Sequence, residues 1–222
     1  MPGIFITIEG IDGAGKSTQA RMLADWLRAQ SLPRACRGGH DALLTREPGG
    51  TELGERLRAL LLDGRARVGA AAELLLYAAD RAQHVEEVIR PALAAGRAVV
   101  CERYTDSTAA YQGYGRGLNL EVVRRLNEFA TGGLEPDLTL LLDLPVELAR
   151  VRMAGTPDRL ERQAVAFHER VKAGYLELAR AHGRRVRAID AAPTPPAVFS
   201  EVTRIVSEFL SPRQTPGRGG ER

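Results

Sequence analysis

The stretch Gly10-Ile11-Asp12-Gly13-Ala14-Gly15-Lys16-Ser17 fits the pattern G-x-x-x-x-G-K-[ST] and is the strongest indication of the fold class. An alternating, β-branched run at residues 4–8 precedes it, and residues 18–30 after it carry apolar side chains at helical spacing. A phosphate-binding loop connects a strand to a helix in this order. The flanking strand and helix therefore argue against a chance match to a short pattern.

The chemistry of this loop points to a polyphosphate ligand. Its backbone N–H groups and the positive end of the following helix can surround phosphates, Lys16 can reach the outer ones, and the Ser17 hydroxyl can bind Mg²⁺. We therefore expect a nucleoside triphosphate at the loop. The residues expected to bind it are Gly10, Asp12, Gly13, Ala14, Gly15, Lys16, Ser17 and Thr18.

Composition indicates an ordinary globular protein. The 222 residues are 44% hydrophobic and 27% charged, and the net charge of +3 is too small to imply a nucleic-acid partner. No apolar run approaches the length needed to span a bilayer, and no secretory signal begins the sequence, so we expect no membrane partner and a cytoplasmic location. The two cysteines, Cys36 and Cys101, form neither a disulfide framework nor a metal-type pair and are expected to be free thiols.

The order of apolar runs predicts an α/β fold. Strand-like runs occur at residues 4–9, 42–45, 98–102, 138–143 and 186–190, and they alternate with helical patterns at 16–30, 52–62, 71–95, 119–131, 145–153, 159–181 and 196–210. Such alternation predicts a P-loop three-layer fold, with a parallel sheet flanked by helices on both faces. The chemistry should lie at the carboxyl ends of the strands.

One domain over residues 1–210 is expected. Ala154-Gly155-Thr156-Pro157 interrupts an arginine-rich helical region, which predicts a short hinged lid at about 150–159. Residues 211–222 are rich in Pro, Gly and Arg without an apolar anchor, and we expect a disordered tail there.

Two clusters suggest a second, phosphorylated substrate. Arg46, in the segment TREPGGT at residues 45–51, follows the second strand and can clamp a phosphate. Tyr77 and Arg81 lie one helical turn apart, so a stacking ring and a hydrogen-bonding guanidinium share a face, as in a base-reading pair. An exposed surface pair is the alternative for Tyr77 and Arg81.

Charged residues also follow the third strand and flank the lid. A carboxylate at the position of Glu102 in a P-loop protein holds Mg²⁺ directly or through water, and Arg103 can grip a phosphoryl group. A surface salt bridge is the alternative. Arg150, Arg152 and Arg159 can neutralise charge on a triphosphate when a lid closes, or they can form a solvated helix face.

Together these motifs resemble bacterial thymidylate kinases over roughly residues 4–208. The resemblance rests on the phosphate loop followed by TREPGGT, YAADRAQHV, ERYTDSTAAYQG, PDLTLLLDLP and DRLE, in that order. It implies a five-stranded parallel core, a homodimer packed through helices, and Mg²⁺- and ATP-dependent conversion of dTMP to dTDP. Loss of the phosphoryl group to water would be prevented by the lid.

The resemblance also implies roles for residues. Asp12 would approach the sugar 3′-hydroxyl, Tyr77 would stack on thymine, and Tyr111 would crowd the place of a ribose 2′-hydroxyl. The residues expected at dTMP are Asp12, Arg46, Pro48, Tyr77, Arg81, Arg103, Thr108, Tyr111 and Gln112. Those expected at the metal are Ser17, Glu102 and Glu47. The expected catalytic groups are Lys16, Arg46, Arg103, Arg150, Arg152 and Arg159.

The chain departs from the family pattern at two positions. Glu102 stands where the family has Asp, so the carboxylate is one methylene longer, and Tyr77 stands where the family usually has Phe. Two other functions stay open. The first is a nucleoside monophosphate or deoxynucleoside kinase that reads another base. The second is a P-loop switch or regulatory module, although the sequence has no N-K-x-D motif.

Overall fold

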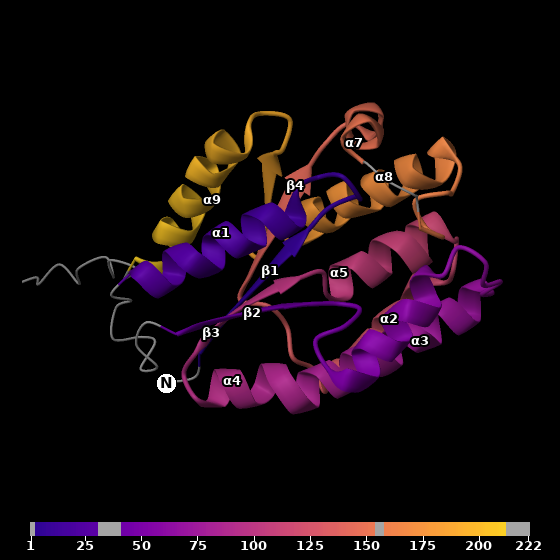
Figure 1. The fold of residues 1–222 in the computed structure, drawn as a ribbon, viewed down its shortest axis with the longest axis horizontal. Coiled ribbons are helices and arrows are strands. Elements are labelled where there is room, and N and C mark those ends of the chain that lie inside the picture. Colours follow the sequence, from indigo (N-terminus) through magenta and orange to yellow (C-terminus); the bar gives the residue numbers. More distant parts are fainter. Residues whose placement is uncertain (1–2, 31–40, 154–157, 212–222) are drawn as a thin grey trace, which may run out of the picture.

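A five-stranded parallel sheet forms the centre of the molecule in the computed structural model, which describes residues 3–30, 41–153 and 158–211. The strands are β1 (Ile4–Glu9), β2 (Ala42–Arg46), β3 (Ala98–Glu102), β4 (Leu138–Asp143) and β5 (Val186–Asp190), in the spatial order β2-β3-β1-β4-β5 (Figure 1). Parallel neighbours require crossovers, which the intervening helices provide. The predicted α/β class and its five strands are confirmed.

Helices cover both faces of the sheet, as Figure 1 shows. The α-helices are α1 (Lys16–Ala29), α2 (Glu52–Leu62), α3 (Ala70–His84), α4 (Arg90–Ala94), α5 (Thr105–Thr108), α6 (Leu120–Thr131), α7 (Val146–Arg152), α8 (Val165–Ala181) and α9 (Pro195–Leu210). Two π-helical segments, η1 (Val85–Ile89) and η2 (Ala109–Gly115), continue α3 and α5. Within the described residues, no helix is both long and apolar enough to cross a membrane.

The core has one cluster on each side of the sheet. Ile6 and Val100 belong to the larger cluster, which includes Leu23 of α1. Phe5 and Val99, their neighbours in β1 and β3, point the other way and pack with residues of η1 and α4. Burial on both faces explains why these strands read as nearly continuous apolar runs.

Several predicted boundaries differ from the structure. The helix expected over 71–95 is α3, η1 and α4 in succession, and the π segment lies just before Pro91, which has no N–H to continue the α-helical pattern. The helix expected from 159 begins at Val165, because residues 159–162 form turns. Helix α5 and η2 were not predicted, since residues 105–115 carry few large apolar side chains at helical spacing.

Some predictions fall on parts of the chain that the structure does not describe. They are the loop expected at 32–40, the Ala154-Gly155-Thr156-Pro157 interruption of the lid, and the tail from 212. Cys36 also lies outside the described residues, whereas Cys101 is a buried free thiol. The single-domain division over 1–210 and the lid at 150–159 stay predictions.

Candidate active site

The phosphate loop lies between β1 and α1, where the sequence places it. Its glycines take backbone angles that other residues rarely adopt, with φ of 79° at Gly13 and 90° at Gly15. A side chain at Gly13 would also meet the carbonyl oxygen of Ala149 at 2.4 Å. Only glycine therefore allows the loop to pass this close to α7 and then enter α1.

This loop forms one wall of a cavity of about 700 Å³. The cavity brings together most of the residues predicted for the site, from every segment that the motifs single out. They are Asp12, Gly13, Gly15, Lys16, Ser17, Thr18, Arg46, Glu47, Pro48, Tyr77, Arg81, Glu102, Arg103, Thr108, Tyr111, Gln112 and Arg152. The phosphate loop and the residues predicted for a second substrate thus share one cavity.

Four predicted residues do not line the cavity. Ala14 is buried in the core, and Gly10 supplies a backbone carbonyl that accepts a hydrogen bond from Arg103 at 3.1 Å. Arg150 is exposed on α7. Arg159 is buried away from the cavity, with its guanidinium donating to Glu73 and to the carbonyl of Leu61.

Arg103 is at the centre of the polar network. It is the only described non-glycine residue with a positive φ, 67°, and its guanidinium donates to the Asp12 carboxylate and, at 3.2 Å, to the Tyr111 hydroxyl. The Tyr111 hydroxyl donates in turn to Asp12 at 2.8 Å. Burial favours a raised pKa for Asp12, but the charges of Arg103 and Lys16 outweigh it and lower that pKa to about 2. Asp12 therefore stays ionised and fixes the guanidinium.

The ammonium group of Lys16 lines the cavity, where it can bind an anion. This group donates to the carbonyl of Ile11 at 2.8 Å and lies 3.9 Å from Asp12. Burial and the neighbouring charge of Arg103 lower the pKa of Lys16 to about 8. Lys16 and Arg103 share the single carboxylate of Asp12, and a phosphate group bound beside Lys16 would add further negative charge to balance them.

Glu9 holds the turn that carries Arg103. The sequence predicts no role for Glu9 beyond its place at a strand end. Its buried carboxylate accepts hydrogen bonds from the backbone N–H of Tyr104 at 2.7 Å, from Ser107 at 2.6 Å and from the Tyr175 hydroxyl at 3.1 Å. Burial, together with the nearby Asp106, raises the pKa of Glu9 to about 7. The turn that carries Arg103 is thus tied to the end of β1.

Glu47 and Arg81 form a buried pair beside the side of the cavity lined by Tyr77, Thr108 and Gln112, which we call the acceptor wall after the second substrate predicted there. Arg81 Nε donates to Glu47 at 2.8 Å, and its Nη1 donates to Thr108 at 2.9 Å and to Asn127 at 2.8 Å. Arg81 is 1% exposed and Tyr77 is 9% exposed. The alternative of an exposed surface pair for these two residues is therefore wrong.

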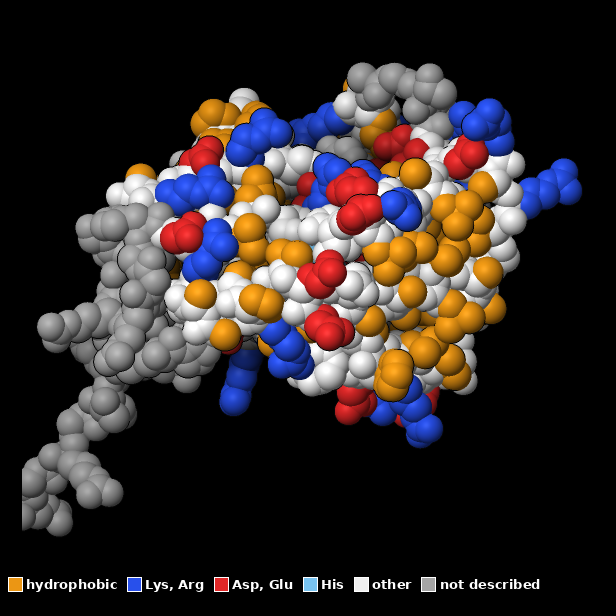
Figure 2. All heavy atoms as spheres, turned by 60° about the horizontal axis from the view of Figure 1, so that its bottom comes forward, with side chains coloured by type: hydrophobic (Ala, Val, Ile, Leu, Met, Phe, Trp, Pro, Cys, Tyr) orange, Lys and Arg blue, Asp and Glu red, His pale blue; other side chains and the backbone are white. Residues whose placement is uncertain are grey.

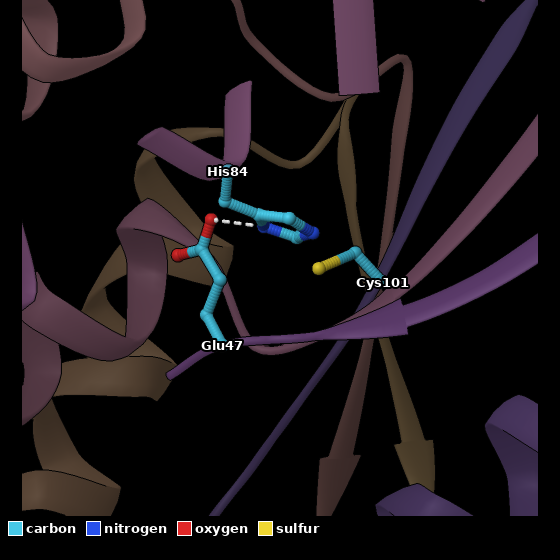
Figure 3. A group of neighbouring side chains, drawn as sticks. All are labelled: Glu47, His84 and Cys101. Carbon is cyan, nitrogen blue, oxygen red and sulfur yellow. Dashed lines mark hydrogen bonds and ion pairs between the residues drawn. The ribbon is translucent and has the colours of Figure 1, made fainter. Parts of the chain in front are cut away.

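The second oxygen of Glu47 faces His84, as Figure 3 shows. His84 Nδ1 lies 3.0 Å from Glu47 Oε1, and its Nε2 lies 2.6 Å from the Thr45 hydroxyl. Potential ligand atoms of Glu47, His84 and Cys101 all lie within 4.8 Å of one another. Because both ring nitrogens and both carboxylate oxygens are already engaged, we interpret the cluster as a support for the loop after β2. The Glu47 carboxylate is turned toward α3.

Asp80 holds the same loop through its backbone. Its Oδ1 accepts a hydrogen bond from the N–H of Gly49 at 2.9 Å, whereas its Oδ2 is buried without a partner. Burial and the charge of Glu47 raise the pKa of Asp80 to about 7. Arg81 and His84 lower the pKa of Asp80, but by less than burial and Glu47 raise it.

Of the three arginines predicted for the lid, Arg152 lines the cavity. It donates to the carbonyl oxygens of Ala191 and Ala192 at 2.7 Å each, just after β5. The same loop contributes Pro193 and Thr194 to the cavity, and Pro195, the first residue of α9, also lines it. Ligand sites of parallel sheets lie at the carboxyl ends of the strands, so the position of this loop after β5 could have predicted that it lines the site.

Six further lining residues had no predicted role at the site. Ser107, Asp158, Leu160 and Glu161 lie inside the motifs ERYTDSTAAYQG and DRLE, whereas Arg58 and Leu62 lie outside every motif. Arg58 and Leu62 belong to α2, where their spacing matches an ordinary amphipathic helix. Only the packing of α2 beside α3 shows that these side chains reach the cavity.

Comparisons with known proteins agree with this geometry. The family model described as thymidylate kinase matches residues 8–202. A thymidylate kinase of Desulfovibrio desulfuricans is 52% identical, over 97% of this chain and 99% of its own length. One from Gloeobacter violaceus is 49% identical, over 96% and 98%. The crystal structure of thymidylate kinase from Ehrlichia chaffeensis superposes with a TM-score of 0.74 at 33% identity, covering 93% of this chain and 99% of that one.

Asp80 generates a prediction about pH. A carboxyl whose pKa rises on folding stabilises the folded state while protonated, and that contribution disappears as the pH rises through about 7. Asp80→Asn keeps an oxygen for Gly49 and cannot ionise. Between pH 5 and pH 8, we expect the wild type to lose on the order of 1–3 kcal/mol of unfolding free energy relative to Asp80→Asn. Urea unfolding at both pH values is the measurement, and parallel pH profiles for the two proteins would contradict the expectation.

Proposed function

The chain belongs to the thymidylate kinase family, and from this membership we propose that it transfers the γ-phosphoryl group of ATP to the 5′-phosphate of dTMP, forming dTDP and ADP. The observation that carries the proposal is the shared cavity. The phosphate loop lines it together with Arg46, Tyr77 and Arg103. A P-loop switch would not require this acceptor-side wall.

We further propose direct in-line transfer. The attacking oxygen belongs to a phosphate that is already an anion, so no strong general base is needed. The protein must instead hold two anions close together, and Lys16, Arg46 and Arg103 supply the positive charge for this task. Because Asp12 and Tyr111 already hold Arg103 in place, little reorganisation is needed when dTMP binds.

The donor set fits Mg²⁺. Ser17 and Glu102 line the cavity beside the phosphate loop, and both offer the hard oxygen ligands that this ion prefers. Mg²⁺ bound with ATP would neutralise charge on the phosphates. The extra methylene of Glu102 favours a contact through water. Glu47 acts on this region only through the loop it supports, because its own carboxylate is engaged by Arg81 and His84.

The acceptor wall suits a deoxynucleotide with a pyrimidine base. Tyr77 offers a ring for stacking, with Gln112 and Thr108 nearby in the cavity lining for the base edge. Arg81 acts by fixing Thr108, to which it donates at 2.9 Å. The bonds of Tyr111 to Asp12 and Arg103 hold its ring rigidly, as exclusion of a 2′-hydroxyl requires.

We also propose a homodimer that works in the cytoplasm. Large apolar side chains are exposed on α2, α3 and α6, including Leu60, Leu75 and Phe129, the last 86% exposed. Figure 2 shows hydrophobic side chains gathered on the right of the view, the side on which α2 and α3 lie in Figure 1. A face of this kind favours association with a second copy. We expect a dimeric molar mass in solution, and a monomeric mass at micromolar concentration would contradict the dimer.

The direct test of the activity is ADP release that depends on dTMP. We expect wild-type protein to form ADP and dTDP in equal amounts, with a higher kcat/KM for dTMP than for dCMP, AMP, GMP or thymidine. Lys16→Ala should lower kcat by at least about 100-fold, because it removes a cation from the phosphates. Lys172→Ala, which removes the only other lysine, is the matched control and should leave kcat nearly unchanged. Nucleotide binding without acceptor-dependent ADP release would overturn the proposal.

The lid arginines are tested by separating chemistry from binding. Arg152 lines the cavity and Arg150 does not, although both lie on α7. If Arg152 stabilises the transferring phosphoryl group, Arg152→Ala should lose about 10²-fold to 10⁴-fold in kcat with a modest change in ATP Kd. Arg150→Ala should lose less than about tenfold. A loss in Arg152→Ala confined to ATP affinity would assign this residue to binding alone.

A further inference from the structure

Glu73 is a buried carboxylate that lies one turn before Tyr77 on α3 and outside the cavity lining. It accepts four hydrogen bonds from three residues. Gln112 Nε2 donates to Oε1 at 2.8 Å, and Arg116 Nε donates to the same oxygen at 3.1 Å. Arg116 Nη2 at 3.0 Å and Arg159 Nη1 at 2.5 Å donate to Oε2. These donors lower the pKa of Glu73 against the effect of its burial, so the carboxylate is ionised.

An ionised carboxylate can only accept hydrogen bonds. The Gln112 amide must therefore turn its nitrogen toward Glu73, since the opposite orientation would set its carbonyl oxygen against a buried negative charge. Gln112 is itself 1% exposed and lines the cavity, so its amide has little freedom. The orientation of the amide is thus decided by a residue that does not touch the ligand.

This orientation matters for reading a pyrimidine edge. Thymine presents a donor at N3 between two carbonyl acceptors, whereas cytosine presents an acceptor at N3 and a donor amino group at C4. A fixed carbonyl oxygen on Gln112 can accept from the thymine N3–H. The same oxygen would face a lone pair on cytosine N3, and a buried mismatch of this kind costs far more than a missing contact.

Resting on the dTMP kinase activity proposed above, we infer that Glu73 is a positioning residue for base specificity, which orients the Gln112 amide so that the site selects a thymine edge over a cytosine edge. Glu73 acts through Gln112 and makes no contact with the nucleotide. Arg116 and Arg159 keep its charge in place.

The test compares dTMP with 5-methyl-dCMP, because both carry the 5-methyl group and differ only at the edge in question. In Glu73→Gln, two guanidinium nitrogens donate at the Oε2 position and only one at the Oε1 position, so the new carbonyl oxygen takes the place of Oε2. The new amide nitrogen then faces Gln112 and favours a flipped Gln112. We expect the kcat/KM ratio of 5-methyl-dCMP to dTMP to rise at least about tenfold. A wild type without dTMP kinase activity would instead refute the proposed function.

Arg116→Gln is the matched control. It breaks the ion pair with Glu73 and leaves the bond between Glu73 and Gln112, so the substrate ratio should stay within about twofold even if the protein is less stable. Glu73→Asp, which keeps an acceptor-only group, should retain most of the discrimination. An unchanged ratio in Glu73→Gln, or an equal change in Arg116→Gln, would overturn the inference.

A measurement on the wild type covers the case in which Glu73→Gln does not fold. With the Gln112 side-chain amide labelled with ¹⁵N, one Nε2 proton should already resonate at the position of a strong hydrogen bond in the free protein. It should move little when dTMP binds. A large shift of the Gln112 amide protons on binding, as expected of donors to the base, would overturn the inference.

Discussion

A carboxylate removed from water must find donors, and this constraint organises the site. Three glutamates, Glu9, Glu47 and Glu73, are almost fully buried, and an isolated buried charge would cost far more than the protein's total stability. Each is therefore met by donors from other elements of the fold. Glu9 ties the turn after β3 to β1, Glu47 ties the loop after β2 to α3, and Glu73 ties α3 to η2 and to Arg159. The donors that meet these three buried carboxyl groups place the side chains that line the cavity.

The sequence predicted the parts of this arrangement that depend on local pattern. The phosphate loop follows from its glycines and from the strand and helix around it, and the strand-end rule correctly brought Arg46 and Arg103 to one edge of the sheet. Neither inference needs knowledge of which side chains pair. Local pattern was sufficient because backbone conformation and strand direction alone fix these positions.

Pairing between distant side chains was beyond the sequence. Arg159 is the last residue of the predicted lid, yet its guanidinium is buried against Glu73, 86 positions earlier in the chain. Arg81 likewise has the spacing of a base-reading residue, but Glu47 and Asn127 occupy most of its donors. A sequence pattern gives the face on which a side chain lies. Only the packed structure shows whether that side chain meets a ligand or a buried charge.

Helix α3 connects the buried carboxylate of Glu73 with the cavity and with the loop after β2, because the residues involved lie on one face of the helix. Glu73, Tyr77, Arg81 and His84 follow one another at intervals of four, four and three residues, which is the period of one helix face. Leu75, two residues after Glu73, points to the opposite side and is exposed in the apolar face that we assign to the dimer. Any rotation of α3 about its axis would move Tyr77 in the cavity and Leu75 on the proposed dimer face together. Association of two copies over α3 would therefore restrain the helix that orients Gln112 and supports the loop after β2.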